Sequence, residues 1–209
     1  MKKSTEATLL NDQIVPLYIQ HLQRNIQRCG LASKLHSYDL KQHGFGVLSI
    51  CLDMIKLLDC CPYSVKEIEA ILFHDILEAV TGDLPAVVKE FSSETKVAWE
   101  IIEDQIVSSP QYSVLSKYTD KSIKETMQSD LHYEIFKFAD ILDLLFYVLE
   151  EEVLGNQSNS IEIIKKDIVT KVHNRIANIA SMFDDPEKVV GSICSYLNTS
   201  EYNISIEVV

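Results

Sequence analysis

Apolar residues recur at intervals of three and four along most of this chain, which is the spacing of amphipathic helices. The predicted helices span approximately residues 14–26, 44–58, 64–80, 93–109, 131–153, 161–182 and 186–197. Ser64 and Glu67 form a capping box at the start of the third of these helices. Ser93 is placed to cap the fourth helix, and alternating residues over 202–209 resemble a strand without an evident partner.

The composition agrees with a helical chain, because 6 glycines and 5 prolines in 209 residues leave few positions for turns. No internal repeat, low-complexity block or linker interrupts the helical pattern, and a chain of this length can bury one large core. We therefore predict an all-α fold, a single helical bundle over 1–209.

The charge balance excludes several classes of partner. The chain carries 19 Lys and Arg against 31 Asp and Glu, a net charge of −12. It therefore lacks a positive footprint for a nucleic-acid polymer or an anionic membrane, and it has no apolar stretch long enough to span a bilayer. Five cysteines without a C-x-x-C pair, and a start without the apolar run of a signal peptide, predict a reduced, cytoplasmic protein.

The clearest chemical signal is a group of three ionisable residues, His74, Asp75 and Glu78, inside the apolar run 70–80. In a continuous helix these residues would share one side. Burying them costs free energy unless they are paired or bind a metal. From this segment alone two interpretations stay open: a core histidine paired with its carboxylate neighbour, or two ligands of one metal ion.

Two other segments carry residues of the same kind. Asp140 and Asp143 lie three positions apart on one stripe of the longest predicted helix, and His43 lies near a helix start that Asp39 could cap. Each feature is ordinary by itself. Together with the pair at 74–75, they place His, His-Asp and Asp in that order along the chain.

This order of residues resembles the HD-domain metal-dependent phosphohydrolases, and among them the bacterial 5′-deoxynucleotidases of the YfbR type. The strongest match is 74–85, which is similar to the HD-x-x-E-x-x-TGDLP segment of that family. Other similar positions are Arg28, Lys137-Phe138-Ala139-Asp140, Glu150-Glu151 and Gly155-Asn156. The resemblance covers about 20–180 and implies a single HD domain over 1–209, with a C-terminal helix and tail over 186–209.

The resemblance also implies a site for one divalent metal ion, which could be Co, Mn, Fe or Zn. The implied metal ligands are His43, His74, Asp75 and Asp140. The implied catalytic residues are Glu78, which would handle the proton of the attacking water, Arg28, which would orient the phosphate, and Asp75. The implied substrate-binding residues are Arg28, Cys29, His43, Asp75, Asp83, Leu84, Pro85, Ala86 and Asp140.

Two positions depart from the family pattern. Lys41-Gln42 stands where the family has Ser-Glu before its first histidine, so a carboxylate that supports His43 is either missing or supplied elsewhere. Cys29 replaces the aromatic residue that follows the family's arginine and helps to shape the sugar pocket. We therefore expect weaker discrimination between deoxyribonucleotides and ribonucleotides than in the family at large.

The expected activity is hydrolysis of (deoxy)nucleoside 5′-monophosphates to nucleoside and phosphate through a metal-activated water. Because the net charge is negative, a nucleotide substrate would have to be held by a local group of positive charges. An arginine can contribute a two-donor contact to the phosphate that lysine cannot make. Two alternatives stay open: an HD-type (deoxy)nucleoside triphosphate hydrolase, and a non-catalytic helical metal-binding or interaction module. The resemblance further implies a homodimer.

Overall fold

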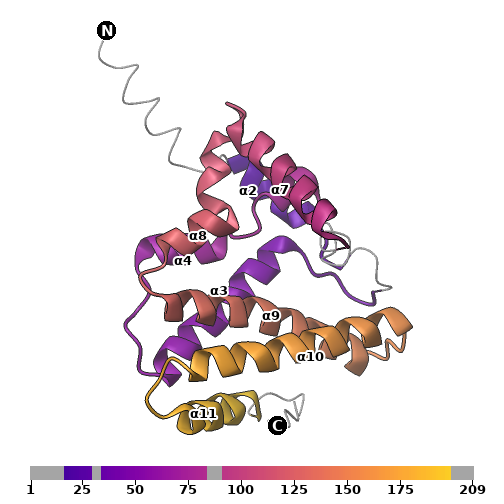
Figure 1. Cartoon of the computed structure of the whole chain (residues 1–209). Coiled ribbons are helices and arrows are strands. Elements are labelled where there is room, and N and C mark those ends of the chain that lie inside the picture. Colours follow the sequence, from indigo (N-terminus) through magenta and orange to yellow (C-terminus); the bar gives the residue numbers. More distant parts are fainter. Residues whose placement is uncertain (1–16, 30–33, 84–90, 199–209) are drawn as a thin grey trace.

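The computed structural model describes residues 17–29, 34–83 and 91–198 (Figure 1). The α-helices are α2 (Leu17–Leu22), α3 (Leu40–Leu57), α4 (Val65–Leu72), α5 (Glu78–Thr81), α7 (Ser93–Ser108), α8 (Asp120–Thr126), α9 (Asp130–Val153), α10 (Asn159–Ala180) and α11 (Pro186–Asn198). The described residues also form the 3-10 helices η1 (Gln23–Asn25) and η2 (Ser113–Tyr118). Within these ranges the β pairing consists of one isolated bridge between Gln27 and Asp39. The predicted all-α fold is confirmed.

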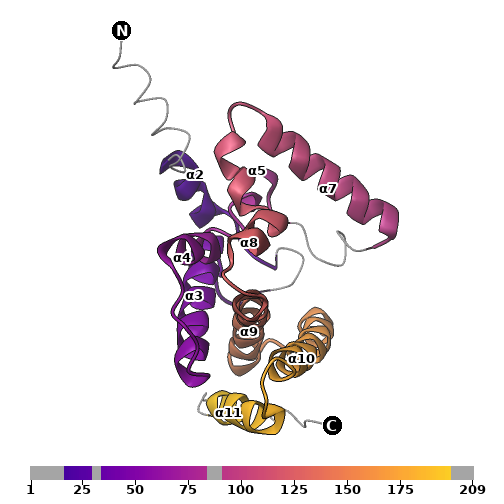
Figure 2. The ribbon, with the colours of Figure 1, turned by 60° about the vertical axis from the view of Figure 1, so that its left-hand side comes forward.

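Helix α9 lies at the centre of the larger apolar core. It packs against α3 on one side and α10 on another, and α11 lies across the end of α10 and also contacts α3 (Figures 1 and 2). Phe138, Ala139 and Leu142 of α9 are 0% exposed. Full burial of a Leu or Phe side chain stabilises a fold by about 1.5–3 kcal/mol, so this helix is a rigid support for the residues it carries.

A second, smaller apolar cluster joins the segment 76–79 to α2 and η2. Ile19, Ile76 and Leu115 are its fully buried members. Helix α7 contacts η2 and buries none of its own residues, and Figure 2 shows it projecting from the rest of the molecule. In the described part of the chain, no helix is both long enough and apolar enough to cross a membrane.

The helix starts follow their capping residues, with one correction. Ser64 and Glu67 form the predicted capping box at α4, and Asp39 caps α3, which begins four residues before the apolar run that predicted it. The predicted cap at Ser93 is wrong by one residue. Ser92 has the extended backbone of an N-cap and its side chain accepts a hydrogen bond from Thr95 N, so the preceding serine of the pair is the cap.

The predicted continuous helix over 64–80 is also wrong. Helix α4 ends at Leu72, and 73–77 form turns before the short α5. The imidazole Nδ1 of His74 lies 2.8 Å from the carbonyl oxygen of Ile71, which an uninterrupted helix would use for the backbone N–H of Asp75. A side chain that takes a backbone acceptor competes with the helix, and here the backbone continues through three-residue hydrogen bonds such as Glu78 N to Asp75 O, 3.0 Å.

Two expectations lie partly or wholly outside the described residues. The first predicted helix is seen as α2 followed by η1, so the part before residue 17 is not described. The strand-like pattern over 202–209 lies wholly outside, and the extent of a single domain over 1–209 stays a prediction.

Candidate active site

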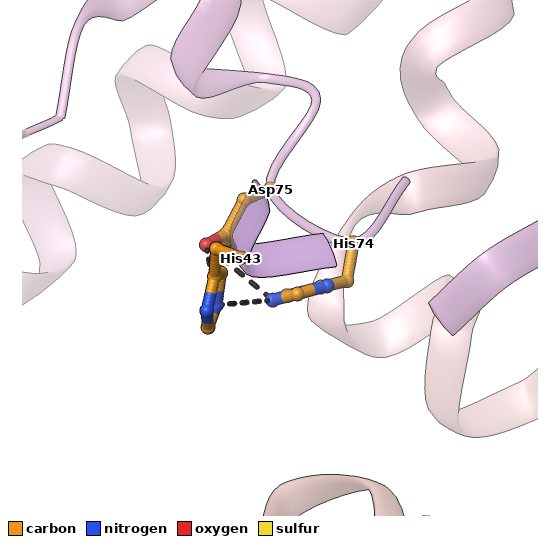
Figure 3. Close-up of side chains that lie close together, drawn as sticks. All are labelled: His43, His74 and Asp75. Atoms are coloured by element: carbon orange, nitrogen blue, oxygen red, sulfur yellow. Dashed lines mark hydrogen bonds and ion pairs between the residues drawn. The ribbon is translucent and has the colours of Figure 1, made fainter. Parts of the chain in front are cut away.

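The four residues expected to bind metal lie close together in space. His43 is in the first turn of α3, and Asp140 is near the middle of α9. His74 and Asp75 occupy the turn after α4. His43 Nε2 lies 3.1 Å from both His74 Nε2 and Asp140 Oδ1. Asp75 Oδ2 lies 3.4 Å from His74 Nε2 and 3.6 Å from His43 Nε2, and Figure 3 shows these three side chains turned toward one another.

These separations suit a shared metal ion. Four ligand atoms placed tetrahedrally about 2.0 Å from an ion lie about 3.3 Å from one another. The distances from the two imidazole Nε2 atoms to each other and to the nearest oxygens of Asp75 and Asp140 run from 3.1 Å to 3.6 Å. Two imidazole nitrogens and two carboxylate oxygens form a donor set that Zn, Fe, Co and Mn all accept. The residues present therefore fit one divalent metal ion.

Both imidazole rings are held so that Nε2 faces the centre. The Nδ1 atom of His74 lies 2.8 Å from the Ile71 carbonyl oxygen, and that of His43 lies 2.8 Å from Asp143 Oδ2. A neutral ring that donates its Nδ1–H to such a partner keeps a free lone pair on Nε2. Histidine ligands of metals are oriented by this kind of outer contact.

Asp143 supplies the carboxylate that the residues before His43 lack. Its Oδ2 atom also accepts a short hydrogen bond from the hydroxyl of Tyr38. Gly46 makes room for it, because a Cβ at this position would lie 1.9 Å from Asp143 Oδ1. Gln42, by contrast, is exposed and its side chain accepts from Asp39 N as part of the α3 cap. The D-x-x-D spacing in α9 was the available sequence signal, but it did not reveal the partner.

Neighbouring positive groups keep the two carboxylates of this centre ionised. Burial by itself raises the pKa of Asp75, but His74 and Arg28 more than offset it, and the pKa lies well below its usual range. For Asp140, Lys137 and the two histidines likewise lower the pKa against the effect of burial. Burial lowers the pKa of His74, yet Asp75 and Asp140 raise it to about 10. The electrostatic field at His74 thus favours an added positive charge.

Arg28 and Glu78 lie beside this centre. The guanidinium group of Arg28 makes a short hydrogen bond to Asp75 Oδ2, and its Nη1 atom lies 3.3 Å from Glu78 Oε2. The backbone N–H of Arg28 donates to the carbonyl of Tyr38 at 2.8 Å, which ties the segment after η1 to the start of α3. Glu78 is 8% exposed at the start of α5.

Lys137 provides a second cation, beside Asp140, and the sequence analysis assigned it no role. Its Nζ atom lies 3.4 Å from Asp140 Oδ2 and 3.5 Å from Asp120 Oδ1. Burial lowers its pKa, but these two carboxylates raise it above the ordinary value for lysine. The three-residue spacing from Asp140 on a helix was the signal that could have identified it. Each of the two carboxylates facing the histidines therefore has a basic side chain behind it.

Glu151 holds the segment that leads to the site. This carboxylate is 0% exposed and accepts hydrogen bonds from the backbone N–H groups of Leu35 and His36 and from Asn156 Nδ2 at 2.6 Å. Burial raises its pKa, but these hydrogen bonds lower it to about 2. Gly155 has a φ of 94°, a conformation that favours glycine, and it brings Asn156 back to this carboxylate.

Only part of the expected sugar and base pocket lies within the described residues. Cys29 is half-buried against the main core with a φ of 55°, and burial raises its pKa to about 11. Asp83 lies near enough to contribute to that shift. Leu84, Pro85 and Ala86 lie outside the described residues.

Comparison with solved structures identifies the fold. The HD phosphohydrolase DatZ of cyanophage S-2L, solved with dA and one catalytic Zn²⁺ ion, matches with a TM-score of 0.67 at 20% identity, over 90% of this chain and 96% of its own. The PH0347 protein of Pyrococcus horikoshii OT3 matches with a TM-score of 0.60 at 17% identity, over 88% of this chain and 95% of its own. At these identities the likeness establishes a shared fold.

Sequence comparison identifies the family. A search of curated proteins found no matching sequence. The model of the YfbR-like 5′-deoxynucleotidase family, however, matches residues 17–185, which is most of the chain. The protein therefore belongs to the YfbR-like 5′-deoxynucleotidase family and is a nucleotide phosphohydrolase.

Proposed function

We propose that the protein hydrolyses (deoxy)nucleoside 5′-monophosphates to the nucleoside and inorganic phosphate. The observation that carries this proposal is that Asp75 and Asp140 each lie 3.1–3.6 Å from the facing Nε2 atoms of His43 and His74, with Arg28 beside Asp75. These four side chains would hold the divalent metal ion, whose identity is open among Co, Mn, Fe and Zn. When bound, the metal lowers the pKa of a coordinated water and polarises the phosphoryl oxygens.

The two basic side chains bind and orient the phosphate in this proposal. Arg28 already lies against Asp75, and its planar guanidinium can keep one contact there while its other N–H groups bind phosphate oxygens. Lys137, next to Asp140, adds a second positive charge. The dianionic substrate thus meets a local positive field on a chain whose net charge is −12.

Glu78 takes the proton of the attacking water in this proposal. Its side chain is nearly buried and shares Arg28 with Asp75, so it is placed next to the metal-facing carboxylate without being one of the four converging groups. A carboxylate in that position can accept a proton and later return it to the leaving alkoxide. The contact with Arg28 Nη1 orients Glu78 for this purpose.

A nucleotide panel tests the proposal. The full chain is supplied in turn with Mn, Co, Zn or Fe, and products from a dNMP, an NMP and a dNTP set are separated and quantified. We expect phosphate and nucleoside from the monophosphates. Release of triphosphate from the dNTP set would assign the chain to the triphosphate hydrolases, and no turnover with any metal would favour a non-catalytic metal-binding module.

The replacement of the family's aromatic residue by Cys29 leads to a specificity prediction. A pocket that is roomier by a few methylene groups changes selectivity by about 1–3 kcal/mol, so we expect a weak preference for dAMP over AMP. Cys29→Trp should strengthen that preference, as measured by the ratio of the two kcat/KM values. A strong preference that Cys29→Trp leaves unchanged would show that another residue selects the sugar.

We also propose that the protein is a cytoplasmic homodimer that binds neither nucleic-acid polymers nor membranes. The net charge of −12 supports the last two points, and the five free cysteines support a reducing compartment. On α7, Val97, Ile101 and Ile102 are 53%, 50% and 42% exposed, which leaves an apolar face that a second copy could cover. Light scattering should then give about twice the chain mass of 23.8 kDa.

A further inference from the structure

A separate cluster around a buried histidine lies at the start of α9, away from the candidate active site. His132 is 2% exposed and Glu67, on α4, is 0% exposed. Cys61 lies in the loop before α4 and is exposed. His132 lies a little more than two turns before Asp140 on α9, which is about 12 Å along the helix axis. The proposed hydrolysis uses none of His132, Glu67 and Cys61.

Glu67 is held as an ionised carboxylate. It accepts hydrogen bonds from the backbone N–H and hydroxyl of Ser64, both at 2.7 Å. It also accepts from the backbone N–H of Gln128 at 2.9 Å and from its side-chain amide at 2.5 Å. Burial raises the pKa of Glu67, but the hydrogen bonds from Gln128, His132 and Ser64 lower it to about 2. Such a group can only accept, so His132 Nδ1, which lies 2.7 Å away, carries a proton.

The other ring nitrogen of His132 faces Cys61. His132 Nε2 lies 3.5 Å from Cys61 Sγ and 3.1 Å from the Cys61 carbonyl oxygen. With Nδ1 protonated, Nε2 has a lone pair that can take the thiol proton. After that transfer the new Nε2–H donates to the carbonyl oxygen of Cys61. The positively charged ring then lies between this oxygen and the carboxylate of Glu67, which both accept its hydrogen bonds. Cys61, His132 and Glu67 are thus in contact in the order of a nucleophile, a base and a carboxylate that orients the base.

We propose that Cys61 is a nucleophilic thiol and a site of covalent modification by low-molecular-weight disulfides, with His132 as its base. In this exchange the Cys61 proton passes to His132 Nε2, and the sulfur attacks one sulfur of the disulfide. A new S–S bond forms as the old one breaks, and the expelled thiolate takes the proton from His132. The products are the mixed disulfide at Cys61 and one equivalent of free thiol, with no net oxidation.

The neighbouring Cys60 does not resolve this mixed disulfide in the folded chain. The described residues contain no cis peptide bond, and the Cα atoms of adjacent residues across a trans peptide are about 3.8 Å apart. Ordinary disulfides span about 4.4–6.8 Å between Cα atoms. The Cys60 thiol instead donates to the carbonyl of Leu58. The modification at Cys61 is therefore expected to persist until an external thiol removes it.

Rates of modification test the proposal. The folded chain and the chain unfolded in urea are treated with oxidised glutathione at neutral pH, and the modified fraction of each cysteine is followed by peptide mass spectrometry. Solvent exposure alone would not make the Cys61 thiol react faster in the folded chain than in the unfolded chain. Because activation raises the thiolate fraction but lowers its intrinsic nucleophilicity, we expect Cys61 to react roughly threefold to tenfold faster when folded. An equal or slower rate in the folded chain would overturn the proposal.

Variants separate His132 from the surrounding loop. His132→Gln, checked for folding by circular dichroism, should bring the Cys61 rate down to that of the unfolded chain. The matched control Cys60→Ser removes the adjacent thiol without touching the ring and should leave the rate unchanged. If His132→Gln folds and reacts as fast as the parent, His132 is not the base. If it does not fold, the comparison of folded and unfolded parent chains still decides the outcome.

Discussion

The candidate active site and the cluster around His132 differ in whether each hydrogen-bond acceptor has a donor within the protein. At the start of α9, His132 has Glu67 on one nitrogen and the Cys61 carbonyl and thiol on the other, so the protein itself satisfies the ring. In the candidate active site, His43 and His74 each use Nδ1 for an outer partner. Their Nε2 atoms then face each other and two ionised carboxylates.

This difference explains why one cluster is suited to a metal ion and the other is not. Two imidazole Nε2 atoms and carboxylate oxygens that lie 3.1–3.6 Å from them repel one another unless a cation lies between them. Around His132 a single proton, held either by the Cys61 thiol or by Nε2, is enough to complete the hydrogen bonding. A carboxylate next to a histidine therefore does not by itself indicate a metal site. The atoms that face the second ring nitrogen distinguish a metal ligand from a histidine whose hydrogen bonds the protein completes.

The largest expected effect comes from removing an acceptor at the active-site centre. Asp75→Ala should lose both bound metal and more than about 10²-fold of activity, because it removes one proposed ligand and the partner of Arg28. Metal content by mass spectrometry and phosphate release are the measurements. His132→Gln serves as the matched change in the other cluster and should retain metal and turnover. Metal loss in both variants would erase the distinction between the two clusters.

Glu78→Ala should separate chemistry from metal binding. We expect unchanged metal content and a decrease in kcat of roughly 10²-fold or more, the usual cost of losing a general acid or base. Titration of the variant with metal, followed by kinetics at saturating metal, distinguishes the two effects. Equal metal loss in Glu78→Ala and Asp75→Ala would instead assign Glu78 to orienting the centre.

Changes behind His43 should have an intermediate effect that appears in metal affinity. Asp143→Asn removes the charge that holds the ring, and Gly46→Ala places a methyl group where the Asp143 carboxylate lies. Both should weaken metal binding by roughly 10- to 100-fold, as measured by competition with a chelating dye. Activity at saturating metal should recover more fully than for Asp75→Ala. Unchanged affinity in both variants would show that α3 alone orients His43.

The smallest expected effect is on stability and concerns the other cluster. Glu67→Gln should cost about 1–3 kcal/mol of unfolding free energy at neutral pH, because charge-assisted hydrogen bonds are lost, with turnover unchanged. The folded pKa of Glu67 is about 2 and its ordinary value is 4.5, so its contribution is present above 4.5 and is lost as pH falls toward 2. Urea unfolding at several pH values measures this. A parent and a variant that lose stability equally between pH 5 and 3 would contradict it.

Local patterns predicted most of the helices and the residues at the site, but not how the HD segment folds. The capping box at Ser64 and Glu67 and the long apolar stripe of α9 depend on neighbours within one or two turns, so they could be recognised from spacing. The turn at 73–77 could not, because it depends on the His74 side chain competing for a backbone acceptor. The same spacing is compatible with an unbroken helix.

The sequence by itself determined the all-α class and the helix ends with strong caps, since these follow from periodicity and local capping. The four side chains proposed to bind metal came from the resemblance to a known family that the motif order carries. Only the tertiary structure decided which carboxylate supports His43 and which further carboxylate Lys137 contacts beside Asp140. Asp143 meets Tyr38 and His43, and Lys137 meets Asp120 of α8, so these contacts depend on the rotation of α9 relative to its neighbours. Packing sets that rotation, and no spacing within a single helix encodes it.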